Sequence, residues 1–173
     1  LAEVDGCIPA HSLAALRTLR DLGARRIWLS NEASLQEIGR LADASPVPVG
    51  ALAYGRPRLA TCERCVLQVA GPCDHNCVAC ELRARSLALR NIDGRDLPVR
   101  VDARGRARIY LDEPLDRIDG LAPVAGGLGA LMVDARAIPL SEAVAALGRV
   151  SRTHATSDRS RGRPYPGPPL RAQ

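Results

Sequence analysis

The sequence predicts an α/β fold in which parallel β/α units are interrupted by a cysteine-rich insertion and a β-hairpin. Short buried strands alternate with amphipathic helices along the chain, five of the six cysteines gather in one segment, and a hairpin pattern follows that segment. Strands and helices that alternate at this rhythm favour a parallel sheet with right-handed crossovers.

The first helix is expected over residues 12–22, where leucines recur with a helical period. Ser12 is a suitable N-cap and Gly23 a suitable C-terminal stop. A short buried strand is expected next, over residues 25–30. These two segments begin the series of β/α units.

The second unit comprises a helix over residues 35–42 and a strand over residues 47–54. Ser34 precedes this helix and Glu37 stands three residues later, which is the spacing of a capping box. The insertion, residues 56–96, begins where this strand ends. In β/α folds ligands gather beyond the carboxyl ends of parallel strands, so the insertion is expected to lie at a binding face.

After the insertion, two alternating segments at 97–102 and 106–111 flank Ala103-Arg104-Gly105 and predict a β-hairpin. A loop and broken helix are expected over residues 114–128, followed by a third buried strand at 130–134 and a helix at 141–150. Residues 151–173 have no periodicity and are rich in Arg, Ser, Pro and Gly, which predicts a disordered tail.

Composition limits the classes of protein that the chain can belong to. Hydrophobic residues make up 46% of it, all 24 basic residues are arginine, and the formal net charge is +5. Arginine clusters can meet phosphates, although a solvated face explains them equally well. The chain has no signal pattern and no segment that approaches a membrane span, so a cytoplasmic location is expected. In that compartment clustered cysteines favour metal binding over disulfides.

The five clustered cysteines follow the spacing C-x2-C-x7-C-x3-C-x2-C, at Cys62, Cys65, Cys73, Cys77 and Cys80. The two C-x2-C pairs suit structural zinc and leave Cys73 spare. A [4Fe–4S] cluster also takes four thiolates and accepts less regular spacing, so the last four cysteines suit it. Spacing alone leaves both cofactors open, with zinc slightly ahead. The sixth cysteine, Cys7, is expected to be a small buried side chain.

An ordered series of short motifs surrounds this segment. Its members are LGAR at 22–25, LS at 29–30, Glu32, SL at 34–35, EI at 37–38, YGR at 54–56 and LPVRVDARGRARIYLDEPLD at 97–116. The series resembles the collagenase-like peptidase family, peptidase family U thirty-two, over about residues 13–150. The resemblance implies a TIM-like barrel. Since a whole barrel needs about 250 residues, residues 1–150 are expected to supply its C-terminal portion.

The resemblance also implies a cofactor and a reaction. Some members of the family bind a [4Fe–4S] cluster through four cysteines and support oxygen-independent hydroxylation of RNA bases or of ubiquinone precursors. The cluster ligands are then expected to be Cys65, Cys73, Cys77 and Cys80, with Cys62 as an alternate. RNA or a quinone precursor is the expected substrate, and a paralogous protein is a possible partner. The resemblance thus moves the choice of cofactor from zinc to iron–sulfur.

The same resemblance places substrate contacts at Glu32, Tyr54, Arg56 and Asp102. The chain departs from the family pattern at two positions. Gly105 stands where some relatives have a cluster ligand, so an additional local cysteine would have to replace it. Gly50 stands where many members carry a glutamate, which weakens any catalytic role at that position.

Two other functions are compatible with the sequence. The family name implies a collagenase-like peptidase, but the chain has no HExxH motif, and its three histidines occur in unrelated contexts without a convincing Ser/His/Asp set. A non-enzymatic zinc-binding interaction module, with the arginine-rich tail contacting nucleic acid, is the other possibility. The low aromatic content of 2% mildly disfavours RNA recognition by base stacking.

Overall fold

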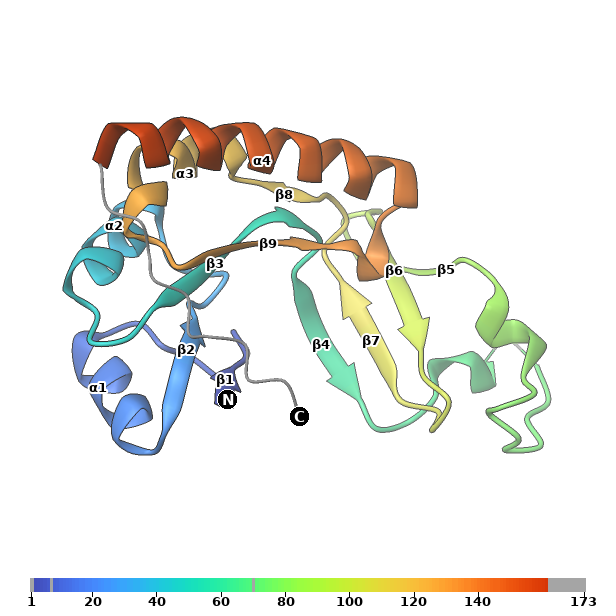
Figure 1. Cartoon of the computed structure of the whole chain (residues 1–173). Helices are drawn as coiled ribbons and strands as arrows, with labels where there is room; N and C mark the ends of the chain where they lie inside the picture. Colours follow the sequence, from blue (N-terminus) through green and yellow to red (C-terminus); the bar gives the residue numbers. More distant parts are fainter. Residues whose placement is uncertain (1, 7, 70, 162–173) are drawn as a thin grey trace, which may run out of the picture. The chain divides into compact units, whose positions relative to one another are not determined.

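The computed structural model describes residues 2–6, 8–69 and 71–161. The chain divides into two compact units, which are considered separately. The first contains the chain up to Leu52, Arg117–Met132 and the chain from Leu147 on, and the second contains Ala53–Asp116 and Val133–Ala146. The mixed α/β content that the sequence predicts is confirmed (Figure 1).

The first sheet contains five strands. They are β1 (Ala2–Val4), β2 (Ala24–Trp28), β3 (Val49–Gly55), β8 (Leu115–Asp116) and β9 (Ala130–Asp134). Their order is β1-β2-β3-β8, and β9 also pairs with β3. The pairs β1–β2 and β2–β3 are parallel, as the alternation of strands and helices predicts, whereas β8 runs antiparallel to β3. The strand β1 was not predicted, because its three residues, two exposed and one partly buried, carry no alternating pattern.

The two predicted N-terminal helices are confirmed as α1 (Leu13–Asp21) and α2 (Leu35–Ala44). The Ser12 side chain accepts a hydrogen bond from the backbone N–H of Ala15, and Gly23 ends the helix with a φ of +97°. At α2 both hydrogen bonds of the Ser34–Glu37 capping box are present. The buried faces of these helices carry Leu16 in α1, which belongs to the predicted helical period, and Ile38 and Leu41 in α2.

The second unit contains a four-stranded antiparallel sheet in the order β4-β7-β6-β5 (Figure 1). Its strands are β4 (Arg58–Cys62), β5 (Leu87–Arg90), β6 (Asp96–Val101) and β7 (Ala107–Tyr110). The predicted hairpin is confirmed as β6–β7, with Val99 opposite Ile109. The strands β4 and β5 lie inside the predicted insertion, so much of that segment is an extension of the hairpin sheet. Val99, Ala107 and Tyr110 are buried in this sheet.

The remaining elements are α3 (Ile118–Leu121), η3 (Ala122–Gly127), η4 (Ala135–Ala137) and α4 (Leu140–Arg161). The first two form the predicted broken helix. Helix α4 contains the predicted helix at 141–150 and continues to Arg161, into the segment predicted as a tail; residues 162–173 lie outside the described part.

Two expectations concern features larger than single elements. The described strands form the two sheets given above and do not close into a barrel, so the TIM-like barrel remains a proposal. No helix among the described residues combines the length and the apolarity that crossing a bilayer requires.

Candidate metal centre

The cysteine-rich segment connects β4 to β5 within the second unit. Two short 3₁₀ turns organise it, η1 (Val66–Val69) and η2 (Glu81–Ala84). Leu67 in η1 is buried. The five clustered cysteines are all free thiols, and Cys7 lies outside the described residues.

A tight turn around His75 separates the second and third candidate ligands, Cys73 and Cys77. The side chain of Asp74 accepts a hydrogen bond from the backbone N–H of Asn76 at 2.9 Å, and the Cys77 N–H donates to the His75 carbonyl at 3.0 Å. His75 has a φ of 62°, and it is the one residue other than glycine with positive φ in the described chain. Left-handed backbone is unfavourable for such residues and is held by its surroundings, often at functional sites.

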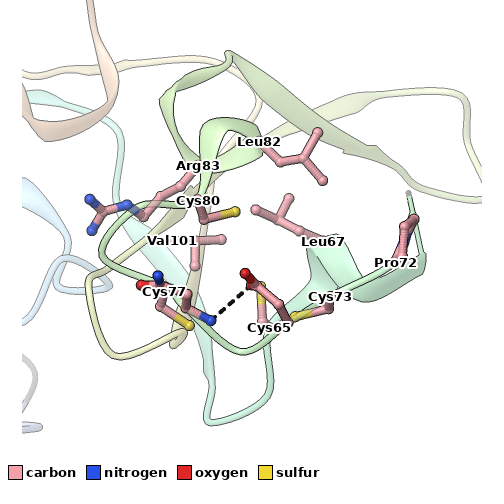
Figure 2. Close-up of a pocket in the computed structure, with 11 residues that line it drawn as sticks. Cys65, Leu67, Pro72, Cys73, Cys77, Cys80, Leu82, Arg83 and Val101 are labelled. Atoms are coloured by element: carbon pink, nitrogen blue, oxygen red, sulfur yellow. Dashed lines mark hydrogen bonds between the residues drawn. The ribbon is translucent and has the colours of Figure 1, made fainter.

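Four of the cysteines line one cavity of about 50 Å³ (Figure 2). They are Cys65, Cys73, Cys77 and Cys80, the set that the family resemblance implies for a cluster. Apolar groups of Leu67, Leu82 and Val101 complete the lining together with more polar residues of the segment. Cys62 is absent from this lining; it is the last residue of β4, where it stands opposite Ala107.

The backbone at Gly105 lies directly against two of these cysteines. A Cβ atom at this position would be 2.9 Å from the Cys77 Sγ and 3.9 Å from the Cys65 Cβ. Gly105 is also in the left-handed region, with a φ of +78°. The space that a ligand side chain at position 105 would use is therefore taken by the Cys77 thiol. Replacement of a ligand at position 105 by a local cysteine stays a prediction.

The pKa of the Cys77 thiol depends on the charges of the other three cysteines. Burial raises the pKa of Cys77, the neighbouring thiols of Cys65, Cys73 and Cys80 raise it further, and the positive charge of Arg83 lowers it. Without a cation, several thiolates in one place repel each other. A bound metal reverses this balance, because it binds the deprotonated form and releases the proton.

The donor set fits a thiolate-bound cofactor. Four cysteine thiolates are the ligands of [4Fe–4S] clusters and of one class of structural zinc site. Throughout the described residues, no three His, Cys, Asp or Glu side chains converge closely enough to hold a metal ion as they stand. The cysteines instead surround a cavity, and a cysteine side chain changes its position by rotation about a single bond.

A second cavity, of about 350 Å³, adjoins the first. It shares three cysteines with it, Cys65, Cys73 and Cys77, and is otherwise lined by Glu63, Arg64, Gln68, His75, Arg104 and Gly105. Arg64 and Arg104 were not predicted as site residues. The only sequence signal for them is adjacency, because Arg64 precedes Cys65 and Arg104 precedes Gly105.

Asp102, one of the expected substrate contacts, is engaged in the β6–β7 turn. Its carboxylate accepts hydrogen bonds from the backbone N–H groups of Arg104 and Arg106 and from the side chains of Arg106 and Arg108, at 2.9 to 3.1 Å. The backbone hydrogen bond from Arg106 is the main reason that the pKa of Asp102 falls from 3.8 to about 2. Asp102 therefore holds the turn that carries Gly105, and its contact with a substrate stays a prediction.

The other three expected substrate contacts have separate environments. The Tyr54 hydroxyl donates to Glu142 at 2.6 Å. Arg56 donates from Nη1 to the Leu111 carbonyl at 2.9 Å, while its Nε is buried without a hydrogen-bond partner among the described residues. Glu32 is exposed and belongs to the first unit, whereas the other three belong to the second. These hydrogen bonds do not bring the four residues together.

Comparisons of the chain with protein families, with curated proteins and with solved structures found no match.

Proposed function

We propose that the chain binds a [4Fe–4S] cluster through the thiolates of Cys65, Cys73, Cys77 and Cys80. One observation carries the proposal: these four side chains come from separate parts of one irregular segment and line a single cavity. The cavity is formed by short turns, and the backbone at His75 is held in an unfavourable conformation. A thiolate-bound cofactor explains why the chain would maintain such an arrangement.

The composition of the cavity supports the cluster ligands over the zinc pairs. Zinc bound by the two C-x2-C pairs would use Cys62 and leave Cys73 spare. The cavity includes Cys73 and omits Cys62, which is paired in β4. The zinc pairs require the reverse, with Cys62 included and Cys73 left out. The cavity contains the four cysteines that are expected to bind a cluster.

The chain's own residues set the environment of the cofactor. Leu67, Leu82 and Val101 contribute apolar side chains to the lining of the cavity. Arg83 lines the same cavity, and its guanidinium group donates to the Val78 carbonyl at 3.2 Å. Its positive charge favours the thiolate form of Cys77. Burial, charge and hydrogen bonds of this kind tune the reduction potential of a cluster. When bound, the cluster supplies one-electron transfer.

For the reaction we propose oxygen-independent hydroxylation of an RNA base or a quinone precursor, in a cytoplasmic protein of which this chain is the C-terminal part of a TIM-like barrel. The ordered motifs of the collagenase-like peptidase family support this proposal, as do the parallel strands β2 and β3. A peptidase is less well supported, because no hydrogen bond joins the His75 side chain to a cysteine or serine among the described residues.

Anaerobic purification followed by iron, sulfide and zinc analysis tests the cofactor. We expect iron and sulfide, with visible absorption that is lost in Cys77→Ala and in Cys73→Ala and kept in the matched control Cys62→Ala. Stoichiometric zinc without sulfide would contradict the cluster. Loss of the metal in Cys62→Ala together with its retention in Cys73→Ala would identify the two C-x2-C pairs as the ligands.

A further inference from the structure

The second cavity opens directly onto the proposed ligands, because Cys65, Cys73 and Cys77 line both cavities. At about 350 Å³ it is much larger than the first, and its other walls are polar. This volume lies at the lower end of the range for small-molecule sites. A group that occupies this cavity would therefore lie beside the cofactor.

Two arginines on the wall of this cavity have no partner among the residues that the structure describes. In the described part of the chain, the guanidinium groups of Arg64 and Arg104 make neither a hydrogen bond nor an ion pair. Their neighbours behave differently: Arg106 and Arg108 both bind the carboxylate of Asp102. A guanidinium group without a partner remains able to bind a carboxylate or a phosphate through two parallel hydrogen bonds.

The charges around the cavity limit what it can hold. Glu63 is the one acidic residue of the wall, against the two arginines Arg64 and Arg104. Bound thiolates add negative charge, so an anion has to meet both arginines to be held. A neutral apolar ligand would gain no binding energy from these charged groups, and a cationic ligand would be repelled by the two arginines.

From these observations we infer that the second cavity is an anion-binding subsite for the substrate, in which Arg64 and Arg104 hold a phosphate or carboxylate group beside the cofactor. The inference rests on the proposed function, since it is the cofactor that makes the neighbouring cavity a substrate site. A concave wall suits a single anionic group of a substrate better than the flat surface of a docking protein.

Calorimetric titration of the purified chain at low ionic strength tests the inference. Inorganic phosphate and malonate are the two probes, and they distinguish a phosphate-bearing from a carboxylate-bearing substrate. We expect one of them to bind. Arg64→Gln and Arg104→Gln should each weaken this binding about tenfold, the effect of losing one charge-assisted hydrogen bond. The matched control is Arg85→Gln, because Arg85 is exposed in the same unit and does not line the cavity.

Iron and sulfide analysis of each variant separates this inference from the proposed function. The inference is supported if Arg64→Gln and Arg104→Gln keep the cluster but lose anion binding. It is also supported if the anion changes the visible spectrum of the unmodified chain and not that of the two variants. A chain that holds its cluster but binds neither probe overturns the inference and leaves the cofactor intact. Equal losses in the Arg85→Gln control also overturn it. A chain without iron that still binds the anion through these arginines keeps the subsite and overturns the cofactor.

Discussion

The strongest test of the site uses two turns of the same design. In the β5–β6 turn, the Asn91 side chain accepts hydrogen bonds from the N–H groups of Asp93 and Arg95, and Gly94 has a φ of +79°. In the β6–β7 turn, Asp102 accepts the equivalent bonds, and Gly105 has a φ of +78°. The backbone hydrogen bonds of the two turns are alike, and the surroundings of the two glycines differ. A Cβ atom at Gly94 would meet nothing within 4 Å, whereas one at Gly105 would be 2.9 Å from the Cys77 Sγ.

Alanine at either position has to adopt left-handed backbone, which costs about 1–2 kcal/mol. In the metal-free chain the close contact at position 105 adds little, because the Cys77 thiol can rotate away. We therefore expect Gly94→Ala and Gly105→Ala to lose similar amounts of unfolding free energy, about 1–2 kcal/mol each. A bound cofactor fixes the Cys77 sulfur. Gly105→Ala should consequently lose most of its metal, while Gly94→Ala keeps it.

Urea denaturation followed by far-ultraviolet circular dichroism measures the first quantity, and iron and sulfide content after anaerobic purification measures the second. The comparison controls for strain, because both glycines have nearly the same φ and the same turn. Equal metal content in the two variants would refute the reasoning, since it would show that the Cys77 sulfur of the loaded chain does not lie against Gly105.

Three further predictions follow from other contacts. Asp102 has a folded pKa of about 2 against an ordinary value of 3.8. The stability that its ionised carboxylate gives to the fold is therefore complete above pH 3.8 and is lost as the pH falls toward 2. The urea midpoints of the unmodified chain and of Asp102→Asn should differ at neutral pH and converge on acidification. Ser34→Ala removes the N-cap hydrogen bond of α2 and should cost about 1 kcal/mol in urea denaturation, with unchanged stability counting against the capping box. Gly50→Glu should displace the Trp28 ring, which lies 2.5 Å from the position of the added Cβ. We expect a red shift in the fluorescence of this single tryptophan. An unchanged spectrum would show that the ring does not fill that space.

The elements that sequence predicted well are those with strong local signals. The capping box placed α2, and the strand at 130–134 agrees with β9 in both bounds because it is a short apolar run. The strands β4 and β5 were missed for a physical reason. Their residues are exposed or only partly buried. Their stability comes from the pairing of β4 with β7 and of β5 with β6. Local propensity does not contain that information.

The site was predicted as a group of candidate ligands but not as an arrangement. Spacing identified five cysteines and could not say which of them face each other. That depends on the turn at His75, whose left-handed backbone is uncommon for any residue other than glycine and was not expected from the local sequence. The adjoining cavity was also beyond prediction, because Arg64 and Arg104 lie 40 residues apart and meet through the β4–β7 pairing.

The position of Cys62 bears on the choice between zinc and a cluster, because spacing alone slightly favours zinc bound by the two C-x2-C pairs. A C-x2-C pair can chelate an ion only when both thiolates lie on the same side of a tight turn. Cys62 instead ends β4, where it pairs with Ala107, and it does not line the cavity. Cys65 is free of this ladder and lines the cavity. Zinc bound by the two pairs would use Cys62, which does not line the cavity, whereas the four cluster cysteines line one cavity with the sheet intact.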